Sequence, residues 1–395
     1  MKPIPNSIAA QAGELAEWRQ DFHRHPELGY AEHRTAAKVA ERLTALGFDG
    51  VETGIGGTGV LGVLHGRAGS GGAAIMLRAD MDALPIDEVT GLPHASTNPG
   101  TMHACGHDGH TTMLLGAAKH LAETRNFDGT VYFCFQPAEE GGGGAKAMLD
   151  DGLFKRYRPR AVYGMHNWPG MPVGQFAVKD GPVLAAASAF TITITGSGSH
   201  AARPHDARDP IVAGAQLVSA LQTMVSRVID PLQPAVLSVT QFHAGSAYNV
   251  IPDQAVLMGT TRCFDDSVQQ QLIDEMDRLC AQIGAAMRVQ IVIVRDAVPY
   301  PPTINDPAEA DFAESVMRET FGDANVVRGH PPTMAGEDFS FFAREVPGCY
   351  VMIGNGDSAP LHNAAYDFND DAAPLGVAYW ARLVERALPR QTTSG

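Results

Sequence analysis

Four continuous apolar runs in the first 180 residues constrain the fold more than any other feature of this sequence. They are residues 58–64, 73–77, 130–135 and 161–164. Strands that are buried on both faces have this unbroken pattern, and such strands belong to parallel sheets that helices cover. A helical pattern at about residues 109–123 separates the second and third runs. We therefore predict an α/β domain of three layers with a mostly parallel sheet.

The pattern changes after residue 181, where residues 190–195 alternate strictly between apolar and polar side chains, as half-exposed strands do. The elements that follow are a helix at about 210–228, strands at 236–242 and 254–263, a helix at about 267–286 and a strand at 288–294. This β-α-β-β-α-β order predicts a ferredoxin-like α+β domain. Because α/β character returns after about residue 296, we predict one discontinuous domain (residues 1–181 and 296–395) with a second domain (182–295) inserted in it.

Charge and composition exclude several classes of protein. The 395 residues include 29 Lys and Arg against 44 Asp and Glu, and this net charge of −15 leaves no basic excess for binding nucleic acid. No unbroken apolar stretch of about 18 residues occurs, and the amino terminus lacks the pattern of a secretory signal, so we expect neither a membrane span nor export. Five cysteines without paired spacing indicate free thiols in the cytoplasm.

Residues 103–110, with the sequence His-Ala-Cys-Gly-His-Asp-Gly-His, are the densest group of metal-binding side chains. In an extended segment alternate residues face the same side, so we expect His103, Cys105 and His107 to point into one cavity. Thiolate and imidazole ligands suit Zn²⁺ or a similar metal. The alternative for this segment alone is a polar loop that caps the following helix.

Further ligand-type residues follow the predicted strands. Glu139 and Glu140 come directly after the third apolar run, and His166 and His362 follow two other predicted strands. Open α/β sheets place their ligand sites at the carboxyl ends of strands. Neighbouring side chains diverge there, so one glutamate can bind metal while the other faces a bound water. A surface turn or a structural histidine would explain each residue singly but not their shared position, so we predict a metal site.

Other acidic residues near these motifs have two interpretations. Asp80 follows an apolar run and would be either a ligand or an acceptor that orients a ligand imidazole. Asp82 and Asp87 are interpreted as turn or cap residues. Glu337 and Asp338 would either support the ligands from behind or begin a helix, and we favour the supporting role, with Glu337 as the candidate.

Five motifs together resemble one family. They read Arg-Ala-Asp-Met-Asp-Ala-Leu-Pro from residue 78, His-Ala-Cys-Gly-His-Asp-Gly-His from 103, Gln-Pro-Ala-Glu-Glu-Gly from 136, Gly-Met-His-Asn-Trp-Pro from 164 and Leu-His-Asn from 361. In this order, over about residues 21–382, they are similar to the hippurate hydrolase and indoleacetyl-amino-acid hydrolase branch of the aminoacylase/carboxypeptidase metallohydrolases. The resemblance implies hydrolysis of N-acyl amino acids, with acetyl, benzoyl or other acyl groups, to a carboxylic acid and a free amino acid.

The resemblance also implies a role for individual residues. The ligands of two divalent ions (Zn²⁺, Mn²⁺, Co²⁺ or Ni²⁺) would be Cys105, His107, Glu140, His166 and His362. Glu139 would be the general base and acid that activates a metal-bound water. In the inserted lid or dimerisation domain, His200 would stabilise the oxyanion, in cis or from a partner subunit. Asn249 and Arg262 would hold the substrate carboxylate. A homodimer or homotetramer is implied through the same domain.

The chain departs from the carboxypeptidase-type relatives of this family in two motifs. Those relatives have His-x-Asp where this chain has Arg78 and Asp80, and a bridging aspartate where this chain has Cys105. Three alternatives stay open: a metallo-carboxypeptidase or dipeptidase that acts on short peptides, a hydrolase with Cys105 as its nucleophile, and a metal-dependent binding protein without turnover. For Asn249 and Arg262 the alternative is a turn residue and a surface ion pair.

Overall fold

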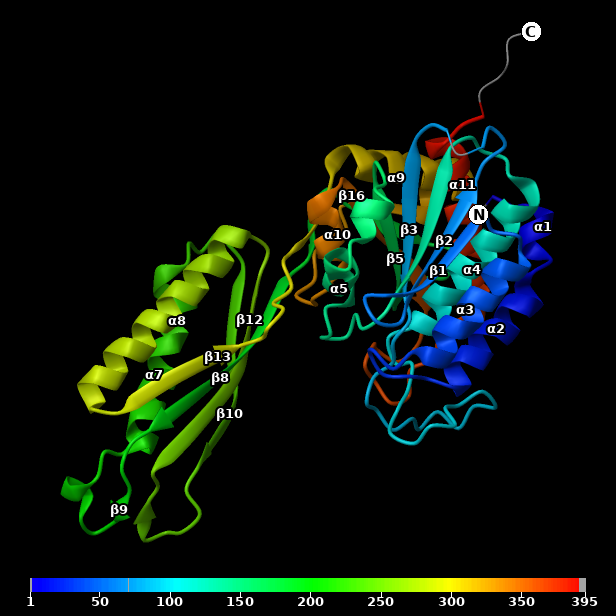
Figure 1. Cartoon of the computed structure of the whole chain (residues 1–395). Coiled ribbons are helices and arrows are strands. Elements are labelled where there is room, and N and C mark those ends of the chain that lie inside the picture. The colour runs from blue at the N-terminus through cyan, green and yellow to red at the C-terminus, as the bar shows by residue number, and fades with distance from the viewer. Residues whose placement is uncertain (1, 70, 391–395) are drawn as a thin grey trace. The chain divides into compact units, whose positions relative to one another are not determined.

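The structure is a computed structural model that describes residues 2–69 and 71–390 (Figure 1). The chain forms two compact units. Unit 1 comprises Met1–Val183, Ile304–Pro331 and Asp338–Gly395, and unit 2 comprises Leu184–Thr303 and Pro332–Glu337. Unit 2 extends past the expected segment 182–295 because two later stretches of the chain pair with residues 184–187 at its beginning. Ala187 and Tyr300 exchange backbone hydrogen bonds, and the Ala185 amide donates to the Ala335 carbonyl.

Unit 1 is built on an eight-stranded mixed sheet with the order β1-β2-β4-β3-β5-β16-β6-β15. Its central strands β4, β3, β5 and β16 are mutually parallel, and the antiparallel pairs lie toward the edges. The strands are β1 (Gly50–Ile55), β2 (Gly59–His65), β3 (Ala74–Asp80), β4 (Thr130–Gln136), β5 (Val162–Pro169), β6 (Phe176–Val178), β15 (Val326–Arg328) and β16 (Gly348–Gly356). The four apolar runs became β2 to β5, and the prediction of a mostly parallel sheet is confirmed.

Helices cover both faces of this sheet. One layer is packed around α4 and α11 and also contains α1, α2, α3 and α9, while α5, α6 and α10 lie on the opposite face. Their bounds are α1 (Asn6–Ala9), α2 (Ala12–Arg24), α3 (His33–Ala45), α4 (His107–Thr124), α5 (Gly144–Asp150), α6 (Leu153–Arg156), α9 (Pro307–Phe321), α10 (Phe339–Glu345) and α11 (Ala373–Ala387). The sequence explains where α9 begins. The amides of Ala308 and Glu309, in the first turn, have no acceptor within the helix, and the carboxylate of the N-cap residue Asp306 accepts from both.

Unit 2 is a four-stranded antiparallel sheet, order β10-β12-β8-β13, covered by two helices. The elements are β8 (Ala186–Thr195), α7 (Pro210–Thr223), β10 (Ala235–Ala244), β12 (Gln254–Cys263), α8 (Asp266–Met287) and β13 (Gln290–Arg295). Alternate β8 residues such as Ile192 and Ile194 are buried in a core shared with Leu217 and Leu272 of the helices. The ferredoxin-like prediction is confirmed.

Short elements complete the fold. β9 (Ser199–His200) pairs with β11 (Val250–Ile251), so that His200 lies opposite Val250. β7 (Gly181–Leu184) and β14 (Thr303–Asn305) form a two-stranded sheet where the chain passes from one unit to the other.

One helical segment, Pro210–Val228, meets a length and hydropathy criterion for membrane-spanning helices. Its 19 residues have a mean hydropathy of 1.2, enough by length and composition to cross a membrane. The expectation of no membrane span rested on the lack of an unbroken apolar run, and this helix is interrupted by polar residues. The same helix buries Ala213, Leu217 and Leu221 in the unit 2 core, and a core helix passes this test as well, so the finding is weak evidence for a membrane span.

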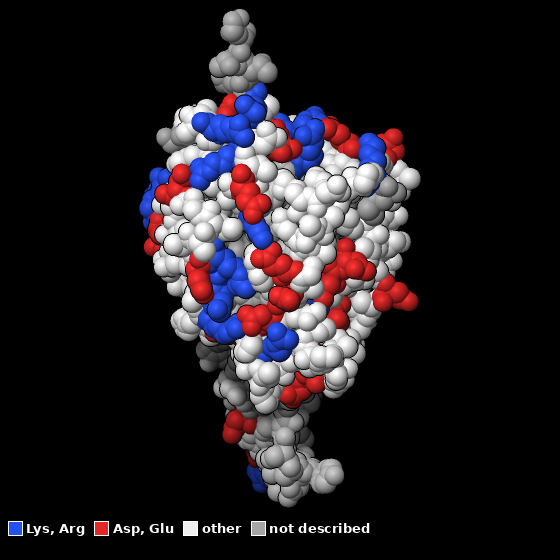
Figure 2. All heavy atoms as spheres, turned by 90° about the vertical axis from the view of Figure 1, so that its right-hand side faces the viewer, with Lys and Arg blue, Asp and Glu red and all other residues white. Residues whose placement is uncertain are grey.

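The outer face of unit 1 that carries the first helices has mixed charge. Basic and acidic side chains are interspersed on it (Figure 2). Several form pairs, such as Arg125 with Asp49 and Lys119 with Glu14. This face therefore has no uniform basic field of the kind that binds polyanions.

Candidate metal centre

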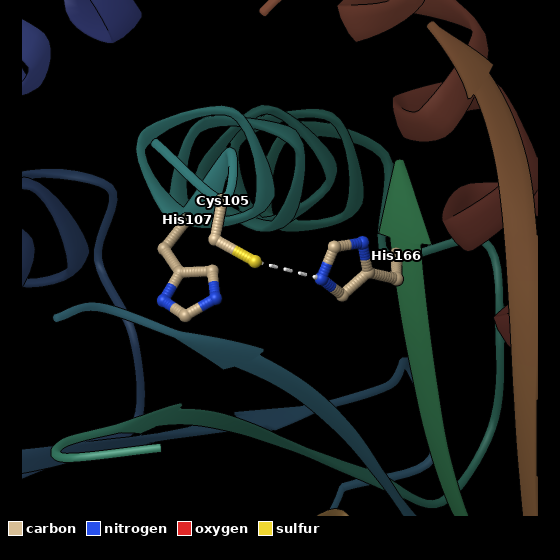
Figure 3. Close-up of side chains that lie close together, drawn as sticks. All are labelled: Cys105, His107 and His166. Atoms are coloured by element: carbon tan, nitrogen blue, oxygen red, sulfur yellow. Dashed lines mark hydrogen bonds between the residues drawn. The ribbon is translucent and has the colours of Figure 1, made fainter. Parts of the chain in front are cut away.

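Three ligand-type side chains from two elements of unit 1 converge at the carboxyl end of the sheet. His107 is the first residue of α4, Cys105 lies two residues before it, and His166 lies on β5. The Cys105 thiol points toward the His166 ring, with the His107 ring beside it (Figure 3), and its Sγ is 3.4 Å from His166 Nε2. One ligand atom from each of the three lies within 4.8 Å of the others, a spacing that a single ion can span.

A second group of three contains the same thiol. Cys105, Glu140 and His362 also offer ligand atoms within 4.8 Å of one another, and His362 Nε2 lies 3.1 Å from Glu140 Oε1. Glu139 belongs to a further group with His107 and Glu140. The structure therefore brings together, inside one unit, all five of the expected ligands and the expected base.

The path between Cys105 and His107 depends on Gly106. Its φ of 92° lies in the left-handed region, and a Cβ added to it would come within 2.3 Å of Asn167 Oδ1. This turn breaks the alternation that we expected of an extended segment. The chain is also not extended at His103 itself, because the Ala104 amide donates to the Met102 carbonyl. His103 is absent from every ligand group found among residues 2–69 and 71–390, and its ring lies 6.4 Å from the His23 ring. The prediction for His103 was wrong.

Asp82 supports the site, although it was interpreted as a turn or cap residue. Its backbone carbonyl is 2.9 Å from His107 Nδ1, and its carboxylate accepts a hydrogen bond of 2.9 Å from the Glu140 amide. The first contact leaves His107 Nε2 as a buried nitrogen without a hydrogen-bond partner, turned toward the ligand group. The signal in the sequence was its position two residues past the end of a buried strand.

Asp80 supports the site through a different histidine. Its two oxygens contact His110 Nδ1 at 2.6 Å and Arg78 Nη1 at 2.7 Å, while His107 Nε2 is 3.8 Å away. His110 Nε2 in turn lies 2.7 Å from Asn167 Oδ1, and the Asn167 carbonyl lies 2.7 Å from His166 Nδ1. His110 and Asn167, which we did not select from the sequence, thus orient the His166 ring from the side of its Nδ1.

The two acidic residues before α10 have different positions. Asp338 is buried in unit 1, where its carboxylate accepts from Arg78, Gln136 and the Ala145 amide. Glu337 ends the short segment that belongs to unit 2, and its carbonyl accepts from the Thr303 hydroxyl. The Asp338 carboxylate therefore ties the start of α10 to β3, β4 and α5 within unit 1.

Burial and charge set the protonation of these groups. Burial, together with Glu140 and Glu139, raises the pKa of the Cys105 thiol well above its ordinary value. Burial and the neighbouring His110 lower the pKa of His166 well below its usual range, so that this ring is neutral and can bind a metal. Burial alone would lower the pKa of His107, but Asp80 and Asp82 raise it to about 10.

These observations fit a pair of divalent cations. The donors are one sulfur, three imidazoles and one carboxylate, a set that suits borderline metals. Carboxylates placed around a buried thiol and two buried imidazoles are costly without a compensating positive charge. The same surroundings argue against Cys105 as a nucleophile, because reactive cysteines lie in electropositive environments that lower the thiol pKa.

In unit 2 the structure brings two of the three expected residues together. His200 and Asn249 line an open hollow of about 360 Å³, and the Ala201 amide donates to the Asn249 carbonyl. The Ala202 amide donates to His200 Nδ1 at 3.0 Å, so a neutral His200 carries its proton on Nε2 and can donate from that atom. Arg262 does not line this hollow: it lies on β12 of the four-stranded sheet, half-buried, with Nε donating to the Met334 carbonyl.

Comparison with known proteins agrees with this geometry. The family model described as peptidase family M20/M25/M40 matches residues 76–386. The hippurate hydrolase of Campylobacter jejuni is 42% identical over 98% of this chain and 100% of its own length. The N-acetylcysteine deacetylase of Bacillus subtilis is 39% identical over 93% of this chain and 95% of its own. A crystal structure of a dinuclear metal binding peptidase from the M20 family of Bacillus subtilis has a TM-score of 0.81 and 35% identity, covering 96% of this chain and 99% of that one.

Proposed function

The chain belongs to peptidase family M20/M25/M40, and we propose that it hydrolyses N-acyl amino acids with Glu139 as the proton shuttle. It is a metal-dependent amidohydrolase. One observation supports the assignment of residues. The five expected ligands form two groups that share Cys105, and Glu139 lies beside them; the ligands are Cys105, His107, Glu140, His166 and His362. The names of the relatives support acyl groups such as benzoyl and acetyl.

Two divalent ions held by these ligands would polarise the amide carbonyl and make water acidic enough to be deprotonated near neutral pH. Glu139 then takes the proton from water as the oxygen attacks the carbonyl carbon. When the C–N bond breaks, the same carboxyl group gives that proton to the departing nitrogen. The products are a carboxylic acid and a free amino acid, and Glu139 returns to its ionised form.

Residues of unit 2 supply the remaining tasks in this proposal. His200 donates from Nε2 to the carbonyl oxygen as negative charge develops on it. Arg262 and Asn249 bind the carboxylate of the amino acid, which selects substrates with a free carboxylate next to the scissile amide. We further propose a homodimer or homotetramer, a cytoplasmic location and Zn²⁺, Mn²⁺, Co²⁺ or Ni²⁺ as the metal. The five buried free cysteines support a reducing compartment.

The test is a substrate panel measured with each metal after removal of bound ions by a chelator. It contains benzoyl-glycine, several N-acetyl amino acids, an indoleacetyl amino acid and short peptides. We expect turnover of N-acyl amino acids that chelation abolishes and divalent metal restores. Preference for short peptides would favour the dipeptidase alternative. Activity that survives chelation but not thiol alkylation would instead favour a Cys105 nucleophile.

A further inference from the structure

The loop that carries Glu139 and Glu140 has an unusual backbone. It spans residues 137–143 between β4 and α5, and Ala138, directly before Glu139, has a φ of 49°. Left-handed backbone is disfavoured for a residue with a Cβ, so it persists only where the surroundings hold it in place. The direction in which Glu139 leaves the loop therefore depends on what contacts Ala138.

Glu32 makes that contact from a distant part of the sequence. It lies just before α3, fully buried, and one carboxylate oxygen accepts a hydrogen bond of 2.7 Å from the Ala138 amide. The other oxygen accepts from the Thr58 hydroxyl at 2.5 Å. The carboxylate makes no capping hydrogen bond to α3. Its contacts are thus directed at the loop and at the turn between β1 and β2.

The residues next to Glu32 fit the same loop. A Cβ added to Gly29 would lie 3.1 Å from the Cα and 3.1 Å from the Cβ of Ala138. The Tyr30 hydroxyl donates a hydrogen bond of 2.8 Å to the Gly142 carbonyl. The loop closes on itself where the Gly144 amide donates to the Ala138 carbonyl. Residues 29–32 therefore contact the loop on both sides of the two glutamates, at Ala138 and at Gly142.

We propose that Glu32 is a positioning residue for Glu139. Its carboxylate satisfies the buried Ala138 amide and so holds the left-handed turn that aims Glu139. Without that acceptor the amide would be buried and unpaired, which favours a rearranged loop. This inference rests on the proposed function of Glu139, but its structural part, control of the loop by Glu32, is independent of any substrate.

The kinetic test compares Glu32→Ala with Glu32→Gln. A glutamine keeps an oxygen that accepts from Ala138 and a nitrogen that donates to Thr58, so it should retain kcat within about 3-fold. Alanine removes both contacts, and we expect kcat to fall about 10–100-fold with KM and metal content little changed, because small misplacement of a reacting group is costly. Thr58→Val, which leaves the Ala138 contact intact, should stay close to wild type.

Glu27→Ala is the matched control. Glu27 lies five residues earlier, and its carboxylate accepts from the Arg34 and Thr35 amides and from the Thr35 hydroxyl at the start of α3. Removing it should lower stability but leave kcat within about 2-fold. Equal losses in kcat for Glu32→Ala and Glu32→Gln, or for Glu32→Ala and Glu27→Ala, would overturn the proposal.

Hydrogen–deuterium exchange tests the structural part without substrate. Amides of the peptide that covers residues 137–144 should exchange faster in Glu32→Ala, and at the wild-type rate in Glu32→Gln and Glu27→Ala. Unchanged exchange in Glu32→Ala would refute control of the loop by Glu32. If wild type hydrolyses no N-acyl amino acid while exchange responds as expected, the proposed function fails and the role of Glu32 in the loop stands.

Discussion

Most site residues of unit 1 are held differently from His200 and Asn249 of unit 2; the exception in unit 1 is His362, whose side chain is 53% exposed. Glu139 is 6% exposed and His107 is 1% exposed, and the ligand-type imidazole of His107 has a backbone acceptor behind it. In unit 2, His200 and Asn249 are exposed, and His200 is oriented by a single backbone amide. Buried groups surrounded by partners are set in advance for proton transfer and metal binding, whereas exposed groups are suited to contacts made after substrate arrives. Changes in the two units should therefore have different signatures.

The largest difference between the units should appear at Glu139. Glu139→Gln removes the proton shuttle but no expected ligand, so we expect kcat to fall by about 10²–10⁴-fold while two metal ions per chain are retained. Steady-state kinetics and elemental analysis measure both. Glu140→Gln is the matched control, since it should lose metal as well as activity. A Glu139→Gln enzyme near full activity would remove the basis of the proposed mechanism.

The corresponding change in unit 2 is His200→Ala. We expect kcat to fall about 10²–10³-fold, the usual effect of losing one oxyanion donor, with metal content and thermal stability unchanged. His205→Ala is the control, because His205 is equally exposed five residues away. If the two variants behave alike, His200 has no role in the reaction and the proposed division of tasks between the units is incorrect.

Buried and exposed histidines should also differ in their effect on stability. In unit 1, His23 Nδ1 lies 2.7 Å from Asp108, and Nε2 lies 3.4 Å from Glu88. The rings of His94 and His103 also face it. Burial alone would lower the pKa of His23, but Asp108 and Glu88 raise it to about 9. The folded state therefore binds this proton more tightly than the unfolded chain does.

The sign of the pH dependence follows from that shift. Stabilisation by charged His23 is complete below about pH 6.5 and is lost as the pH rises through about 9, by at most about 3 kcal/mol. Urea unfolding of wild type and His23→Gln between pH 6 and pH 9.5 should show the difference between them shrinking as pH rises. His243→Gln, in an exposed part of unit 2, should show no such trend. A constant difference for His23→Gln would contradict the assigned pKa.

The smallest effect is expected at Arg262. If it binds the substrate carboxylate, Arg262→Ala should raise KM about 10–100-fold with kcat within a few-fold, because a charge-assisted contact is lost equally from the ground and transition states. Substrates whose carboxylate is amidated should be insensitive to the change. Its bond to the Met334 carbonyl offers a purely structural role. A fall in unit 2 stability with unchanged KM would favour that role.

Much of the fold could be predicted because its signals are local. Continuous apolar runs such as the one that became β3 identify buried strands, and the strict alternation of β8 identifies a half-exposed one. The ligand-type residues could be found because strand ends meet at one edge of a sheet. Asp82 and Glu32 could not be assigned, since their roles depend on backbone amides of a loop that is distant in the sequence. His103 was misplaced because the segment is not extended there: the Ala104 amide donates to the Met102 carbonyl, and the alternation of an extended strand does not apply.

Because there is no free volume at Gly106, a substitution at this position would disrupt the metal centre without changing any of the ligands or Glu139. A single methyl at this position would press on Asn167 and on the Tyr366 hydroxyl, 2.7 Å from where the added carbon would lie. Asn167 would then shift, and with it the carbonyl against which His166 rests. A substitution screen that follows only the ligands and the base would miss this effect, and a chain with all five ligands and Glu139 intact could still be inactive.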